Sequence, residues 1–137
     1  MVAAVQAIME RSSWNAKVDW NDGSYDGLVS LVSVGNGKRT GGVFFMTPQA
    51  DPIGGRLAFS HGYNKSWMNM FQVLPSAMKP EAGNISEQKG IHELHDTSLK
   101  IHLDKPSPAH TDGEIFDQRL SDFEFKIFPS TVPILVP

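Results

Sequence analysis

Apolar and polar residues alternate along several short stretches of the chain, a pattern typical of β-strands. The clearest example is 14–20, where Trp14, Ala16, Val18 and Trp20 share one face. Turn signals rich in glycine and asparagine separate these stretches, so we expect a mainly β domain that resembles a β-sandwich. The predicted strands cover 14–20, 28–34, 43–46, 56–60, 98–103 and 122–128.

Two further stretches carry apolar residues at helical spacing. Residues 2–11 predict a short helix, and residues 64–78 predict a longer one that Pro75 should kink or end early. The apolar stripe of the second helix either packs in the core or faces lipid; it comprises Trp67, Met70, Phe71 and Leu74. We therefore expect one or two helices beside a β-rich body over 14–137, and an edge strand or extended tail over 132–136.

Length and composition narrow the classes of function. The 137 residues suit a single domain over 1–137, and the net charge of -3 argues against a broad nucleic-acid surface. The chain has no cysteine, which excludes disulfides and cysteine-ligated metals. No apolar run reaches the about 18 residues of a membrane span. We expect a cytoplasmic protein that binds no nucleic acid.

The tripeptide Asp112-Gly113-Glu114 is the strongest candidate for chemistry. Glycine readily adopts the positive φ angle of a tight turn, so the segment is typical of a polar hairpin. The same turn can also hold a carboxylate at the mouth of a site, where it acts as a base or binds a cation. The residues alone leave both interpretations open.

A histidine-rich segment, His92-Glu93-Leu94-His95, resembles a metal motif but has the wrong spacing. The zinc-protease pattern needs two residues between the glutamate and the second histidine, and here there is one. We therefore predict a loop or the edge of a strand. His102 falls on the polar face of a predicted strand and should be exposed.

Three groups of residues occur in an order that resembles a known family. They are Val34-Gly35-Asn36-Gly37 with Gly41-Gly42 and 46–51; Gly90-Ile91-His92-Glu93-Leu94-His95; and Asp112-Gly113-Glu114 with 125–129 and 134–137. The ordered set is similar to the C-terminal domain of the diacylglycerol kinase and sphingosine kinase family of lipid kinases. The resemblance covers about residues 14–137.

The resemblance implies one half of an ATP-dependent lipid kinase. Members of the family carry a Gly-Gly-Asp-Gly nucleotide loop in an N-terminal domain, and this chain contains no such loop. We therefore expect this chain to be the acceptor-binding half alone and to be inactive in isolation. The complete enzyme is expected to bind Mg-ATP, and this chain is expected to hold no cofactor tightly. The implied partners are the missing nucleotide-binding domain and a lipid substrate or membrane surface. Peripheral association with a membrane is one expected location, and the formation of a homodimer stays an open alternative.

The resemblance also implies roles for individual residues. Glu114 is the expected general base that takes the proton of the acceptor hydroxyl, and Asp112 is expected to organise the magnesium-nucleotide or to polarise Glu114. Apart from the resemblance, His110 lies two residues before Asp112 and is a candidate contact for substrate phosphate. Lys38 and Arg39 form either a solvated loop tip, which is the favoured interpretation, or a contact for phosphate or a lipid headgroup.

One position departs from the family pattern. An aspartate of its structural magnesium site is replaced by Gly54, so we expect no firmly bound metal, with Asp51 as a weak substitute.

Two other functions stay open at this point. One is a non-catalytic lipid-binding or regulatory β-module, which the missing nucleotide loop and Gly54 favour. The other is a carbohydrate-binding β-sandwich that uses Trp14, Trp20 and Tyr25 as stacking platforms. The alternation over 14–20 places both tryptophans inward with Val18, which favours a core role for them instead.

Overall fold

The computed structural model describes residues 13–63, 73, 75–79, 85, 88 and 90–129. Nine strands lie within these residues: β1 (Trp14–Trp20), β2 (Gly23–Val29), β3 (Leu31–Gly35), β4 (Leu57–Gly62), β5 (Ile91–Asp96), β6 (Ser98–Ser107), β7 (His110–Thr111), β8 (Glu114–Ile115) and β9 (Leu120–Lys126). The predicted mainly β fold is confirmed.

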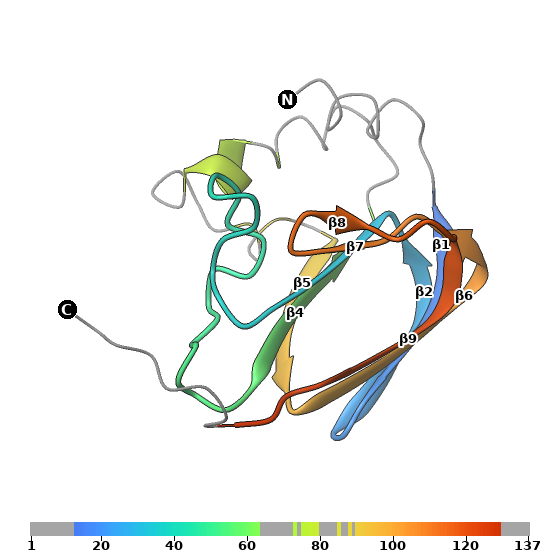
Figure 1. Ribbon diagram of the computed structural model, residues 1–137, viewed down its shortest axis with the longest axis horizontal. Helices are drawn as coiled ribbons and strands as arrows, with labels where there is room; N and C mark the ends of the chain where they lie inside the picture. Colours follow the sequence, from blue (N-terminus) through green and yellow to red (C-terminus); the bar gives the residue numbers. More distant parts are fainter. Residues whose placement is uncertain are drawn as a thin grey trace.

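The strands form two antiparallel sheets and a small hairpin (Figure 1). Sheet A has the order β2-β1-β6-β9, sheet B has the order β3-β4-β5, and β7 pairs only with β8. The predicted helix over 2–11 and the predicted tail over 132–136 lie outside the described residues. Of the predicted helix over 64–78, the described residues Val73 and Pro75–Met78 are helical. Within the described part of the chain, no helix has the length and apolar character of a membrane span.

Two predicted strands are wrong. The apolar run 28–34 is divided between β2, which pairs with β1, and β3, which pairs with β4. At the break, the Ser30 amide donates a hydrogen bond of 2.8 Å to the Gly62 carbonyl, and the chain passes from one sheet to the other. The run 43–46 is a turn instead, closed by a bridge between Thr40 and Phe44.

The core lies between the two sheets and follows from the alternation of β1 and β6. Phe59 and Val18 are 0% exposed and Leu99 is 1% exposed, so sheet B and sheet A both contribute. Burial of side chains of this size contributes about 1.5–3 kcal/mol each. Trp20 packs against Phe59, with ring centroids 5.9 Å apart.

A buried carboxylate fixes one end of the sandwich. Asp96 is the last residue of β5. It accepts hydrogen bonds from the backbone amide of Asn21 (2.8 Å), the side-chain amide of Asn21 and the amide of Thr97. Burial alone would raise the pKa of Asp96, but these hydrogen bonds outweigh it and lower the pKa below its ordinary value. The carboxylate thereby ties the β1–β2 turn to the β5–β6 turn.

The outward face of sheet B is covered by the loop that joins β3 to β4. The Ser60 hydroxyl donates to the Met46 carbonyl at 2.6 Å, and the Gln49 amide donates to Glu93 at 3.0 Å. Within the loop, the buried Thr47 hydroxyl donates to the Gly37 carbonyl at 2.9 Å and so joins two segments of the loop. Polar side chains of sheet B therefore anchor the loop through backbone groups.

Candidate functional site

The Asp112-Gly113 turn joins β7 to β8 in a hairpin that is inserted between β6 and β9 (Figure 1). Asp112 has a φ of 47° and Gly113 has a φ of 90°, so both central residues are left-handed. Two such residues between paired strands make a type I′ turn, for which Asp-Gly is a preferred sequence. The hairpin interpretation of this segment is confirmed, and Asp112 has a conformational role in it.

The pairing of the hairpin fixes which side chains share a face. Thr111 pairs with Glu114, and His110 pairs with Ile115. Because successive residues of a strand point to opposite faces, Glu114 and His110 project on opposite sides of the ribbon. The hairpin therefore does not by itself bring the predicted base and the predicted phosphate contact together.

The predicted polar residues of the hairpin are all exposed. The side chains of His110, Asp112 and Glu114 make no hydrogen bond or ion pair with any other residue that the structure describes. Beside them, the apolar side chains of Ile115 and Phe116 are 77% and 47% exposed. The hairpin thus combines a free carboxylate with an apolar surface.

Lys38 and Arg39 lie on the exposed loop that follows β3. The Arg39 guanidinium lies 4.6 Å from the ring centroid of Phe45, a cation–π contact within the same loop. No hydrogen bond or ion pair between described residues joins either cation to Glu114. Their contact with a phosphate or a headgroup stays a prediction.

Hydrogen bonds within the loop around Gly54 engage Asp51. The Asp51 side chain accepts a hydrogen bond of 3.1 Å from the Ile53 amide, and its carbonyl accepts one of 3.1 Å from the Gly54 amide. Among the described residues, no group of three His, Asp or Glu side chains is placed to hold a cation. Gly54 offers no side-chain ligand at the position of the family aspartate, and the weak substitution by Asp51 stays a prediction.

The histidine-rich segment is β5, at the edge of sheet B, as its strand-edge interpretation predicted. His92 faces sheet A, whereas Glu93 and His95 face the loop. Glu93 Oε1 lies 3.3 Å from His95 Nε2 and also accepts from the Gln49 amide. Glu93 Oε2 is buried and has no hydrogen-bond partner in the described part of the chain. The strand geometry thus separates the two histidines that are near in sequence.

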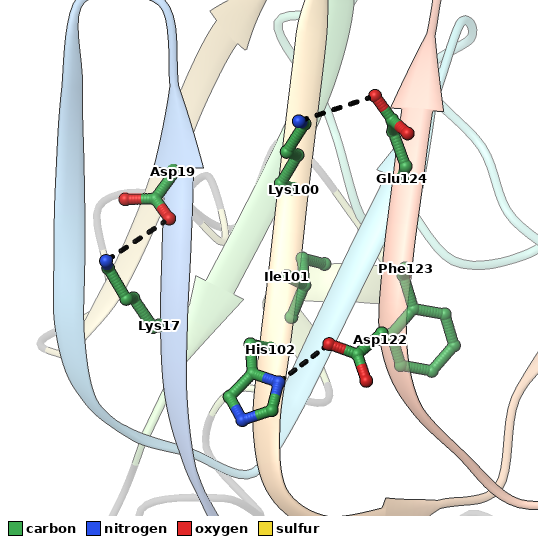
Figure 2. Close-up of a pocket in the computed structure, with 8 residues that line it drawn as sticks. All are labelled: Lys17, Asp19, Lys100, Ile101, His102, Asp122, Phe123 and Glu124. Atoms are coloured by element: carbon green, nitrogen blue, oxygen red, sulfur yellow. Dashed lines mark hydrogen bonds and ion pairs between the residues drawn. The ribbon is translucent and has the colours of Figure 1, made fainter.

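The outer face of sheet A forms an open groove of about 550 Å³ (Figure 2). Opposite charges face one another across its strands: Lys100 lies between Asp19 and Glu124, and His102 lies opposite Asp122. His102 Nδ1 is 2.7 Å from Asp122 Oδ1. Compensated pairs of this kind stabilise an exposed sheet face, so they are weak evidence for a ligand site.

A smaller open pocket of about 230 Å³ is lined by residues of both sheets. Its lining includes Trp20, Tyr25 and His61, and the Tyr25 and His61 rings are 4.4 Å apart. Trp20 and Tyr25 therefore pack against sheet B, and Lys105 lies 5.6 Å above the Trp14 ring. These positions do not form the exposed aromatic platform of the carbohydrate hypothesis. Sequence reasoning missed His61, because only the pairing of β4 with β5 reveals its neighbours.

Comparison with solved structures identifies the fold. No family model and no curated protein match the chain. Two solved structures of proteins assigned as diacylglycerol kinases from Bacillus anthracis strain Sterne each match 92% of the chain at 17% identity. Their TM-scores are 0.70 and 0.67. The chain spans only 40% and 42% of those proteins. The predicted resemblance is therefore confirmed at the level of the fold: the chain has the fold of one part of a diacylglycerol kinase-like protein, consistent with the C-terminal domain of such a protein.

Proposed function

We propose that this chain is the acceptor-binding half of a lipid kinase, and that Glu114 is its general base. The observation that carries the proposal is the position of Glu114 on a tight hairpin of a fold shared with diacylglycerol kinase-like proteins. A type I′ turn has little conformational freedom, so the carboxylate is held where a second domain can approach it. Phosphoryl transfer depends mainly on such positioning.

The proposed step uses the carboxylate of Glu114 as a proton acceptor. The acceptor hydroxyl gives its proton to Glu114 while its oxygen bonds to the γ-phosphorus of ATP, and the bond to the β-phosphate oxygen breaks to release ADP. The nucleotide and its magnesium are held by the domain that this chain does not contain. Glu114 makes no competing interaction with a described residue, so both oxygens remain available for this task.

The apolar residues next to Glu114 support a lipid acceptor. Ile115 and Phe116 are exposed, and exposed apolar side chains on a projecting hairpin suit contact with acyl chains or a membrane surface. A soluble acceptor would gain nothing from this apolar surface. Diacylglycerol, a class that the neighbouring structures' names suggest, is the acceptor to test first.

The test is a fusion of this chain to the nucleotide-binding part of the Bacillus anthracis protein. Transfer of labelled phosphate from ATP to dioctanoylglycerol is measured for the fusion, for Glu114→Gln and for the matched control Asp117→Asn, another exposed carboxylate nearby. We expect Glu114→Gln to lower kcat by about 10²–10⁴-fold and Asp117→Asn to leave it within a few-fold. An active fusion that keeps its rate in Glu114→Gln would contradict the role of Glu114.

A second candidate is a non-catalytic lipid-binding module, which the same exposed pair, Ile115 and Phe116, favours. The double variant Ile115→Ser/Phe116→Ser should reduce co-sedimentation of the chain with phosphatidylglycerol vesicles. The matched control is Ile53→Ser, because Ile53 is 90% exposed on a different loop. Vesicle binding together with an inactive fusion favours this second candidate, whereas no vesicle binding contradicts it.

A further inference from the structure

The sequence suggests His92 and His95 as a histidine pair, but the structure brings a different pair of histidines together. Residues three apart on a strand point to opposite faces, so His92 and His95 cannot share a ligand. Across sheet B, however, His92 lies directly opposite His61 of β4. Their rings are on the same face, with centroids 5.5 Å apart and planes inclined by 34°.

This ring separation is close to that of two imidazoles bound to one cation. With zinc–nitrogen distances of about 2.0–2.1 Å, the metal lies about 3.2 Å from each ring centre, and at a tetrahedral angle the centres are about 5.2 Å apart. The 5.5 Å separation of His61 and His92 differs from this by a few tenths of an ångström, which a small rotation of the more exposed His92 would supply.

Both histidines line the same open pocket of about 230 Å³. His61 is 3% exposed, whereas His92 is exposed to solvent. The remaining titratable group that lines this pocket is Tyr25, whose hydroxyl donates to the Leu28 carbonyl at 2.9 Å. Because the pocket opens to solvent, water molecules can complete the coordination of a cation there.

We infer that His61 and His92 form a cross-strand site for a late first-row divalent metal, Zn²⁺ in the first instance. Imidazole suits this class of cation, and hard cations such as Mg²⁺ prefer oxygen ligands. The described residues offer no third His, Asp or Glu to the pair, so water fills the other positions. The site is distinct from the Glu114 hairpin and does not depend on the proposed kinase function.

The experiment is calorimetric titration of the untagged chain with ZnCl₂ at pH 7.5. All five histidines of the sequence are described, which makes matched controls available. We expect one equivalent of Zn²⁺ to bind, with affinity lowered on the order of tenfold or more in His92→Asn and His61→Asn. His95→Asn and His102→Asn should bind as the original chain does, and MgCl₂ should give no heat of binding.

His92→Asn is the decisive variant, because its exposed ring can be replaced without opening the core. Circular dichroism establishes whether His61→Asn is folded, and an unfolded variant is set aside in favour of His92→Asn. As a second measurement, Cu²⁺ should broaden the ring resonances of His61 and His92 before those of the other histidines. Absence of Zn²⁺ binding, unchanged binding in His92→Asn, or loss of binding in His102→Asn would each overturn the inference.

Discussion

The buried His61 should make the protein lose stability in mild acid. Its ring is 3% exposed and is packed between Tyr25, at 4.4 Å, and His92, at 5.5 Å. Burial, and then the proximity of His92, lower the pKa of His61 from 6.5 to about 4. Protonation therefore places a charge beside a second histidine, where no carboxylate among the described residues compensates it.

The direction and size of the effect follow from the two pKa values. The unfolded chain binds this proton near pH 6.5 and the folded chain only near pH 4, so acid favours the unfolded state. The stability from neutral His61 is complete above the unfolded pKa and is lost as the pH falls toward the folded pKa. At 1.36 kcal/mol per unit, the loss is about 2 kcal/mol at pH 5 and about 3 kcal/mol at pH 4.

A loss of this size is measurable by urea unfolding. The free energy of unfolding is determined at pH 7.5 and pH 5.0, with EDTA present, for the original chain, for His61→Phe and for the exposed control His110→Gln. We expect the original chain and His110→Gln to lose about 2 kcal/mol more between these pH values than His61→Phe does. An equal loss in His61→Phe would refute the reasoning, because carboxylates common to all three proteins would then cause the acid sensitivity.

Three further predictions follow from other parts of the molecule. In urea unfolding, Gly90→Ala should lower the free energy of unfolding by clearly more than Gly113→Ala does. Both glycines have positive φ, but a Cβ at Gly90 would lie 2.6 Å from the Tyr63 carbonyl oxygen, whereas a Cβ at Gly113 would meet nothing within 4 Å. Asp96→Asn should cost about 1–3 kcal/mol at pH 7, and this cost should shrink as the pH falls from the ordinary aspartate pKa through the lowered pKa of folded Asp96, below which the carboxyl is neutral in both states. The isolated chain should show no transfer of phosphate from ATP to dioctanoylglycerol, and turnover by the purified chain would contradict the proposal that it is one half of a kinase.

Local sequence patterns predicted the strands whose two faces have different environments. The alternation over 14–20 gave the bounds of β1, because one face is buried in the core and the other carries Lys17 and Asp19. The alternations of β6 and β9 were found for the same reason, although β6 continues to Ser107. The Asp112-Gly113 turn was also predictable, since its two left-handed residues have a known chemical preference.

Patterns that depend on distant pairing were not predictable. The run 28–34 is apolar throughout, and nothing local shows that Ser30 is the point at which the chain changes sheets. The β2 residues before Leu28 are largely polar and small, so that strand was missed. The proximity of His61 and His92 exists only because β4 and β5 are paired in one register. No spacing rule within a single segment can supply it.

The two candidate sites differ in what each still needs for its chemistry. Glu114 lies in solvent, where the electrostatic interactions that support phosphoryl transfer are weak until water is excluded. Its proposed role therefore requires a second domain to close over the hairpin, which agrees with the chain covering only 40% of the structure that it matches. The His61–His92 pair lines an open pocket within this chain, and the proposed site needs only a cation and water. Metal binding should therefore be intact in the isolated chain, whereas the proposed phosphoryl transfer should appear only in the fusion that supplies a nucleotide-binding domain.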